Sequence, residues 1–200
     1  ISIHIPIILT VFFPLALGWI YPNIFSPTHV ILLELIMGPT CSIIYENEPL
    51  ENNAMQQEPR PFTNTFFNFK ELLTSIVQGL VITLGALMVY QYAVYMLYNE
   101  DVTRTMVFLV LLYANIFLTL VNRSFYFSIW TTFKYKNNLV FIIIGITLLL
   151  AILLLFVKPL THFFEFENLN SSQIAVSFLV GLLSVLWYEL VKWRKRSIES

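Results

Sequence analysis

Charged residues are scarce in this sequence. Asp, Glu, Lys and Arg make up 12% of its 200 residues, whereas a soluble domain carries about 25% because its surface must face water. Five stretches contain none of these four residue types: 1–33, 72–99, 105–122, 137–157 and 168–188. This shortage of charge excludes an ordinary water-soluble domain.

Cysteine and the common catalytic motifs are missing as well. The single cysteine, Cys41, cannot form a disulfide framework, so cysteine usage does not indicate the redox compartment. The sequence contains no Walker phosphate loop, no dinucleotide fingerprint, no HExxH zinc motif and no CxxC pair. Between its uncharged stretches it has no room for a soluble catalytic domain.

Long apolar runs dominate what is present. Hydrophobic residues make up 58% of the chain, and its mean hydropathy is +0.75. About 20 apolar residues in a helix cross a hydrocarbon core of about 30 Å, and inside lipid the backbone must satisfy its own hydrogen bonds. We therefore predict an all-α membrane protein, a single transmembrane domain over residues 1–200 that is a bundle of about six transmembrane helices. The expected spans are 5–21, 28–45, 72–97, 105–122, 139–157 and 173–191, with the first uncharged stretch divided by turn residues near 18–27.

The basic residues predict the orientation. With six spans, one side of the membrane receives the 46–71 loop, the 123–137 loop and the 192–200 tail, which together hold nine of the 11 Lys and Arg residues; the other side receives only Arg104 and Lys158. The positive-inside rule then places both termini and the 46–71 loop in the cytoplasm of a cell-membrane protein. Beside a span, the basic tail indicates the inner face or anionic lipid, so we expect a lipid bilayer as partner and no nucleic acid.

The second span carries the clearest functional signal. Glu34 lies near its middle, and an ionisable group at that depth costs about 2.5–3.5 kcal/mol on insertion scales. Pro39 cannot donate a hydrogen bond to the carbonyl of Leu35, and Gly38 adds local freedom. A carboxylate beside freed carbonyls in a kinked or broken helix is a common way to bind a cation at the membrane midplane. The alternative is a kinked helix whose protonated Glu34 hydrogen-bonds to a neighbouring helix.

The first and fourth spans hold further candidates. Pro6 and Pro14 predict kinks or breaks in the first span, and Pro6 lies close to His4. Asn115 lies mid-membrane in the fourth span, where an amide either coordinates an ion or joins helices by hydrogen bonds. A lone histidine is more often structural than a ligand, so both interpretations of His4 and of Asn115 stay open.

Several short runs resemble one family. They are His4-Ile5-Pro6-Ile7, Pro27-Thr28-His29-Val30-Ile31-Leu32-Leu33-Glu34-Leu35-Ile36, Pro39-Thr40-Cys41-Ser42-Ile43-Ile44-Tyr45-Glu46-Asn47-Glu48-Pro49, Met55 with Pro59-Arg60-Pro61, and Asn122-Arg123-Ser124. Together they are similar to the C-terminal membrane region of bacterial cation-transporting P-type ATPases of the calcium-pump-like class. The match covers the whole chain, which would begin within that family's fifth transmembrane helix. Because Ile1 is not a start methionine, we expect a part of a longer protein.

The resemblance implies a function and a set of partners. Such pumps couple ATP hydrolysis, with magnesium and an aspartyl-phosphate in cytoplasmic domains, to alternating access of a cation site. It implies that His4, Glu34 and Asn115 bind the metal cation, with Glu34 the main ligand, and that the N-terminal remainder of the pump supplies the ATP chemistry. The chain alone would not hydrolyse ATP. The family has an aspartate where this sequence has Gly38, which puts calcium in doubt because calcium takes six to eight oxygen ligands.

Two other classes of function stay open at this point. A membrane scaffold that only anchors partners would tolerate Glu34→Gln. A self-contained channel or half of a secondary transporter would move ions without ATP.

Overall fold

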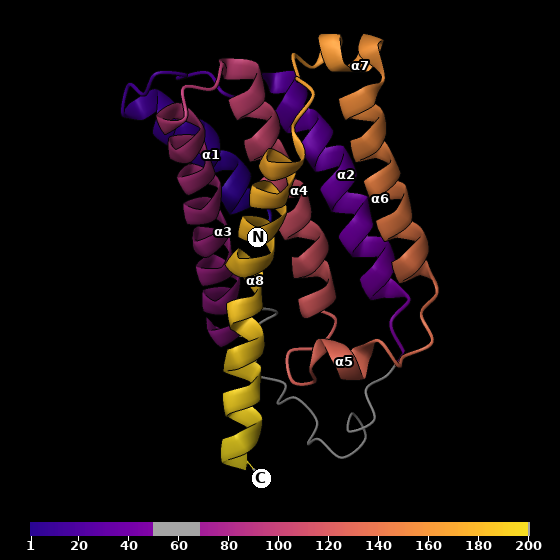
Figure 1. Ribbon diagram of the computed structural model, residues 1–200. Helices are drawn as coiled ribbons and strands as arrows, with labels where there is room; N and C mark the ends of the chain where they lie inside the picture. Colours follow the sequence, from indigo (N-terminus) through magenta and orange to yellow (C-terminus); the bar gives the residue numbers. More distant parts are fainter. Residues whose placement is uncertain (50–68, 200) are drawn as a thin grey trace.

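The computed structural model describes residues 1–49 and 69–199 of the chain, and every regular element in that part is a helix. Most of the predicted 46–71 loop lies outside these residues, together with Met55 and the 59–61 run of the family resemblance. The helices are α1 (His4–Ala16), α2 (Pro27–Glu46), α3 (Phe69–Tyr95), α4 (Glu100–Val121), α5 (Ile129–Thr132), α6 (Leu139–Phe156), α7 (Lys158–Phe163) and α8 (Ser171–Glu199), as shown in Figure 1. The prediction of an all-α membrane protein is confirmed.

Five helices within the described ranges are long and apolar enough to cross a membrane, namely α2, α3, α4, α6 and α8. The sixth expected span corresponds to α1, which is apolar but has 13 residues and ends at Ala16 rather than near residue 21. Gly18 follows with a φ of +61°, and the amide of Trp19 donates to the carbonyl of Pro14 at 2.9 Å. This turn, which only glycine adopts without strain, stops α1 before it spans the expected length.

Of the kinks or breaks predicted at the prolines, the breaks are absent, because helical backbone continues past Pro6, Pro14 and Pro39. The kinks stay a prediction. Pro6 lies in the first turn of α1, where an N–H would have no partner inside the helix. Pro39 lies inside α2, which runs from Pro27 to Glu46 without interruption. Directly after Pro39, the hydroxyl of Thr40 donates to the carbonyl of Ile36, one turn earlier in α2.

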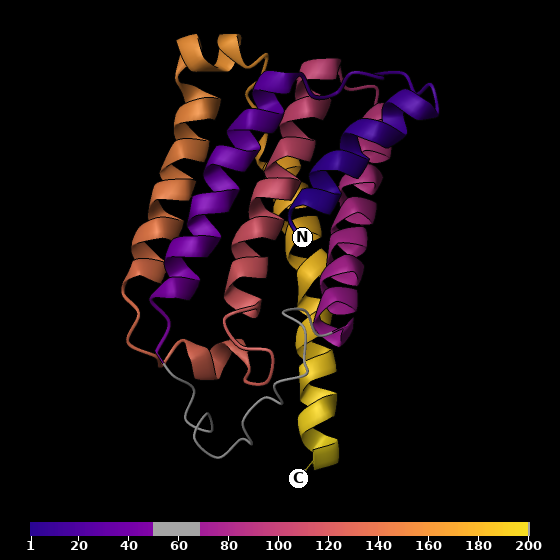
Figure 2. The same cartoon turned by 180° about the vertical axis from the view of Figure 1, so that it is seen from behind.

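The bundle has two ends that differ in what they carry. In Figures 1 and 2 the α1–α2 connection, the start of α4 and α7 lie at one end, here called the α7 end. The end of α2, the short helix α5 and the C-terminal part of α8 lie at the other, here called the α5 end. Successive long helices therefore run in opposite directions between the two ends, as antiparallel neighbours in a helical bundle do.

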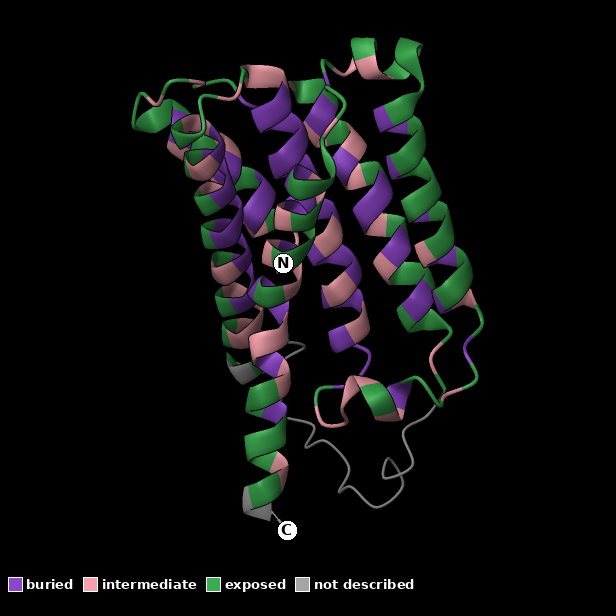
Figure 3. Cartoon of the chain, viewed as in Figure 1, coloured by how far each residue is buried: buried purple, intermediate pink, exposed green. Residues whose placement is uncertain are grey.

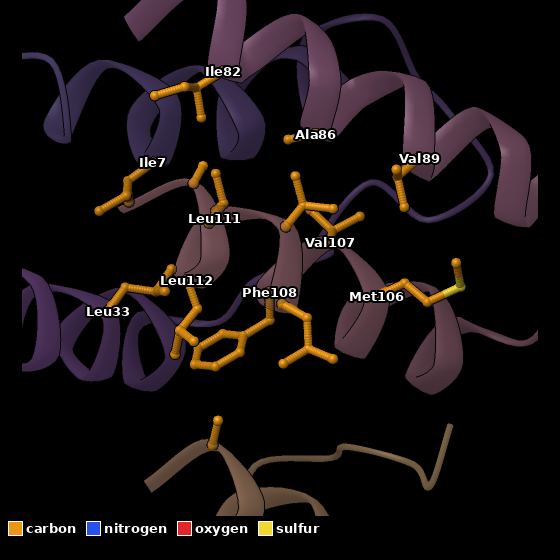
Figure 4. Packing of buried hydrophobic residues seen from close by; sticks show 14 of the residues in the cluster. Ile7, Leu33, Ile82, Ala86, Val89, Met106, Val107, Phe108, Leu111 and Leu112 are labelled. Atoms are coloured by element: carbon orange, nitrogen blue, oxygen red, sulfur yellow. The ribbon is translucent and has the colours of Figure 1, made fainter. Parts of the chain in front are cut away.

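Helix α4 is the centre of the bundle. Within the part of each helix apolar enough to span, 83% of the residues of α4 are buried against 28% for α6, and Figure 3 shows α4 mostly purple and α6 mostly green. Figure 4 shows α4 contributing Met106, Val107, Phe108, Leu111 and Leu112 to the core, among side chains from α1, α2 and α3. The exposed apolar surface of α6 is what a helix facing lipid requires.

Glycines allow α3 and α8 to approach their neighbours closely. A Cβ added at Gly79 would lie 2.9 Å from the Cβ of Ile5 in α1, and one at Gly85 would lie 3.1 Å from Val180 in α8. At Gly181 it would lie 2.9 Å from the Cβ of Tyr113 in α4. Small residues at helix contacts are the usual device for packing helices in a membrane, where apolar burial alone gives little gain.

Candidate cation site

The structure brings together two of the three predicted ligands. His4, in the first turn of α1, lies with its Nδ1 2.8 Å from Oε1 of Glu34 in the middle of α2. The side chains are 54% and 38% exposed in this chain. A carboxylate at membrane depth thus has an imidazole partner, which removes the need for an unpaired charge there.

The start of α2, which sets the position of Glu34, is fixed by a buried histidine. The ring nitrogen Nε2 of His29 lies 2.6 Å from the carbonyl oxygen of Phe164, which can only accept, so Nε2 carries the hydrogen. The other nitrogen, Nδ1, accepts from the amide of Ser26, the residue that caps α2, at 3.1 Å. These two bonds tie the first turn of α2 to the segment between α7 and α8.

Arg104 fixes the loop before α2 in the same region. Its side chain is 5% exposed, and its Nε donates to the carbonyl of Ile24 at 2.8 Å. Its Nη1 and Nη2 contact the carboxylates of Asp101 and Glu100 at 2.6 and 2.7 Å, and Nη1 also donates to the carbonyl of Glu165 at 2.9 Å. Each of the three guanidinium nitrogens of Arg104 therefore has at least one partner, as a buried charge requires.

The far end of α2 is held by a second buried pair. Arg123 donates to Oε1 of Glu48 from Nε at 3.0 Å and from Nη2 at 2.6 Å. The side-chain amide of Asn137 donates to the same carboxylate at 2.9 Å and to the carbonyl of Ile44 at 3.1 Å. Two-pronged contacts between arginine and a carboxylate are strong and fix orientation, so this pair locks the end of α2 to the loop after α4.

Asn115 lies apart from the other two predicted ligands. It is 3% exposed, and its Oδ1 lies 3.6 Å from Sγ of Cys41, whose sulfur is also 3.1 Å from the hydroxyl of Thr119. Its amide nitrogen Nδ2 is buried without a hydrogen-bond partner among the residues that the structure describes. Cys41 follows Glu34 by two turns of α2, about 10 Å along the helix axis. The predicted triad is therefore divided into two parts.

One cavity borders both parts. It has a volume of about 610 Å³ and is lined by His4, Gly38 and Cys41, and farther along by Glu48 and Arg123. A Cβ added at Gly38 would meet no atom within 4 Å, so this position opens onto free space. The cavity joins the His4–Glu34 pair, through His4, to the surroundings of Cys41.

Leu35 and Pro39, which were also predicted to lie at the ion path, border α6 and not the 610 Å³ cavity. Leu35 and Pro39 line a smaller hollow of about 170 Å³ between α2 and α6, together with Ile143 and Thr147. The side chain of Leu35 is 67% exposed. The part that main-chain oxygens near Pro39 take in cation binding stays a prediction.

The side chains that could bind a metal ion are few and scattered in the part of the chain that the structure describes. No group of three or more His, Cys, Asp or Glu side chains that could hold a metal ion occurs in residues 1–49 and 69–199. A calcium ion takes six to eight oxygen ligands, and Glu34 with Asn115 offers at most a few. Glu34 and Asn115 do not line the 610 Å³ cavity themselves; their neighbours His4 and Cys41 do, and the carboxylate on its wall is that of Glu48, which is paired with Arg123.

Sequence reasoning missed the contacts that hold α2 in place. Thr119 lies four residues after Asn115 and so shares its face of α4, a spacing that could have indicated the Cys41 contact. The partners of His29, Glu48 and Arg123 lie 135, 75 and 75 residues away in the chain. No local pattern indicates bonds over such separations.

Comparison with known sequences supports the family that the resemblance indicated. The sequence profile described as "Cation transporting ATPase, C-terminus" matches residues 22–194. The search of curated proteins gave no match to the chain. The matched region runs from the α1–α2 connection to the last part of α8 and so includes Glu34, Cys41 and Asn115. The chain belongs to the family of cation-transporting ATPase C-terminal regions.

Proposed function

We propose that this chain supplies part of the cation-binding site of an ATP-driven pump, with Glu34 as its principal ligand. The observation that carries the proposal is the pair of Glu34 and His4, a carboxylate at mid-helix whose imidazole partner lines a partly open cavity. A carboxylate placed only for packing would have no use for a cavity beside its partner. ATP, magnesium and the phosphorylated aspartate belong, in this proposal, to domains outside this chain.

His4 has a defined role in the proposed site. The imidazole of His4 lies 2.8 Å from Oε1 of Glu34 and occupies one of the positions from which a cation would approach that oxygen. His4 therefore competes with the cation for Glu34 and keeps the carboxylate paired when the cation is absent. This arrangement avoids the cost of an unpaired carboxylate in a membrane.

Asn115 forms the second part of the proposed site. Its buried amide lies beside Cys41 and Thr119, and its unpartnered nitrogen indicates that the amide has bonding capacity left over in this arrangement. Rotation of the amide would turn its oxygen toward a cation. The basic residues around α5 and at the end of α8 support placing the α5 end in the cytoplasm.

The test is the ATPase activity of the complete pump that contains this chain, measured over a panel of monovalent and divalent cations. We expect one cation to stimulate hydrolysis, and Glu34→Gln to raise the concentration that gives half-maximal stimulation by about tenfold or more, because a neutral amide replaces the charged ligand. Glu46→Gln is the matched control, since Glu46 is an exposed residue on the same helix. Unchanged stimulation in Glu34→Gln would assign Glu34 a packing role and favour a scaffold.

A further inference from the structure

The α5 end carries an exposed aromatic row that continues onto the lipid-facing helix α6. The ring of Trp130 in α5 lies 6.5 Å from that of Phe133, which lies 6.1 Å from Phe141 in α6. Trp130 is 81% exposed and Phe141 62% exposed. Because α6 turns an exposed apolar surface outward, the row beside it faces the same lipid. Tryptophan at such a position is typical of the boundary between lipid and water.

Basic side chains accompany this row. Lys134 and Lys136, in the segment between α5 and α6, are both exposed. We call Trp130, Phe133, Lys134, Lys136 and Phe141 together the α5–α6 corner. Figure 1 shows α5 lying across the end of the bundle, next to the lower end of α6. This orientation places the two lysines where a membrane-parallel segment would meet lipid headgroups.

A polar hollow opens at the same corner. It has a volume of about 490 Å³ and is lined by Asn47, Lys136, Asn137, Asn138 and Leu139. The neighbouring carboxylate of Glu48 is paired with buried Arg123, so it does not cancel the charge of Lys136. Glu46, the last residue of α2, is exposed. Asn137 already donates to Glu48 and Ile44, so the hollow offers the ammonium group of Lys136 together with the side-chain amides of Asn47 and Asn138. This combination suits an anionic phosphate ester.

The α7 end, in contrast, exposes mostly acidic side chains. Glu100, Asp101 and Glu165 there have side chains 43%, 49% and 63% exposed, and Lys158 is exposed. Arg104 is buried and already bound by these acids. Selection for an anionic headgroup is therefore expected at the α5 end and not at the α7 end.

We infer that the α5–α6 corner binds an anionic phospholipid, with its phosphate group beside Lys136 in the hollow and its acyl chains along α6 next to Phe141. Electrostatic attraction to an anionic membrane is worth about fivefold in partition for each basic residue near the surface. Trp130 marks the headgroup level and serves as a built-in reporter. This inference does not depend on Glu34 or on the transported cation.

The test uses the complete pump in bilayers of phosphatidylcholine that contain either brominated phosphatidylglycerol or brominated phosphatidylcholine at equal mole fraction. Bromine quenches nearby tryptophan fluorescence, and the signal of Trp130 is the difference between the wild-type protein and Trp130→Phe. We expect brominated phosphatidylglycerol to be favoured at Trp130 over brominated phosphatidylcholine by about fivefold for one lysine and up to about 25-fold if Lys134 and Lys136 both contribute. The double variant Lys134→Gln and Lys136→Gln should lose this preference, while Lys134→Arg with Lys136→Arg should keep it.

Lys158→Gln is the matched control, because it removes an exposed lysine at the α7 end. Retained quenching by brominated phosphatidylcholine in the Lys→Gln double variant shows that the corner still faces lipid. Equal quenching by the two lipids in the wild type, or a preference that survives the double variant, would overturn the inference. Absence of quenching by either lipid would do so too, and would indicate that protein covers the corner.

Discussion

The contact between α8 and α4 at Gly181 gives the sharpest test of the packing. An added Cβ at this position would lie 2.9 Å from the Cβ of Tyr113, 3.1 Å from the carbonyl oxygen of Val110 and 3.2 Å from the amide nitrogen of Ala114. Two of these atoms are backbone and the third is the first side-chain carbon, so none can turn away. Gly181→Ala must therefore push two helices apart.

The magnitude follows from two opposing terms. Overpacking of this kind costs about 1–3 kcal/mol, and the upper part of that range applies because α4 is the buried centre of the bundle. Replacing glycine by alanine inside a helix returns about 1 kcal/mol. We expect Gly181→Ala to lower the free energy of unfolding by about 1–2 kcal/mol.

Gly145 in α6 provides the matched control, because a Cβ added there would meet nothing within 4 Å. Gly145→Ala should raise the free energy of unfolding by up to about 1 kcal/mol through helix propensity alone. The assay is reversible unfolding of the protein in mixed micelles with increasing sodium dodecyl sulfate, followed by circular dichroism. If the two variants change stability in the same direction, the close approach of α8 to α4 is wrong.

Three further outcomes follow from the polar contacts. Arg104→Gln should lower the free energy of unfolding by about 2–3 kcal/mol in the same assay, because it leaves several acceptors unpaired; a change below about 0.5 kcal/mol would contradict this role. Glu48→Arg and Arg123→Glu should each destabilise the protein and, when combined, recover part of the loss; additive losses would show that the two residues do not act as a pair. His4→Gln should lower the cation concentration for half-maximal ATPase stimulation, since Glu34 loses its competitor; a higher concentration would make His4 a ligand instead.

The membrane character of the chain could be predicted because hydropathy is a local property. Uncharged stretches of about 20 residues leave a helix as the main solution in lipid, and all five long apolar helices lie at predicted positions. The turn near Gly18 was recognised in the sequence, but the expected span was continued through it to residue 21, whereas α1 ends at Ala16. Helices α5 and α7 were also missed, since four and six residues are too few for a periodic pattern.

The candidate site was predictable in its members but not in its arrangement. Glu34 and Asn115 are conspicuous in sequence because polar groups are rare in apolar spans, and His4 was indicated by the proline beside it. Which of them meet depends on the rotation of α1, α2 and α4 about their axes, and sequence patterns set this rotation only loosely. In the structure Glu34 pairs with His4, whereas Asn115 contacts Cys41.

The contacts of α2 indicate how the proposed site would respond to movement. Residues of α4, or just after it, hold the α2 region at three levels: Arg104 at the loop before it, Thr119 at Cys41 in its middle, and Arg123 at its end. Glu34, in contrast, is paired with α1. Any displacement of α1 relative to α4 therefore changes the surroundings of Glu34 first, while the bonds at both ends keep α2 in place. A cation that takes the place of His4 at Glu34 would in turn release α1, so occupancy of the site and the position of α1 are linked in both directions.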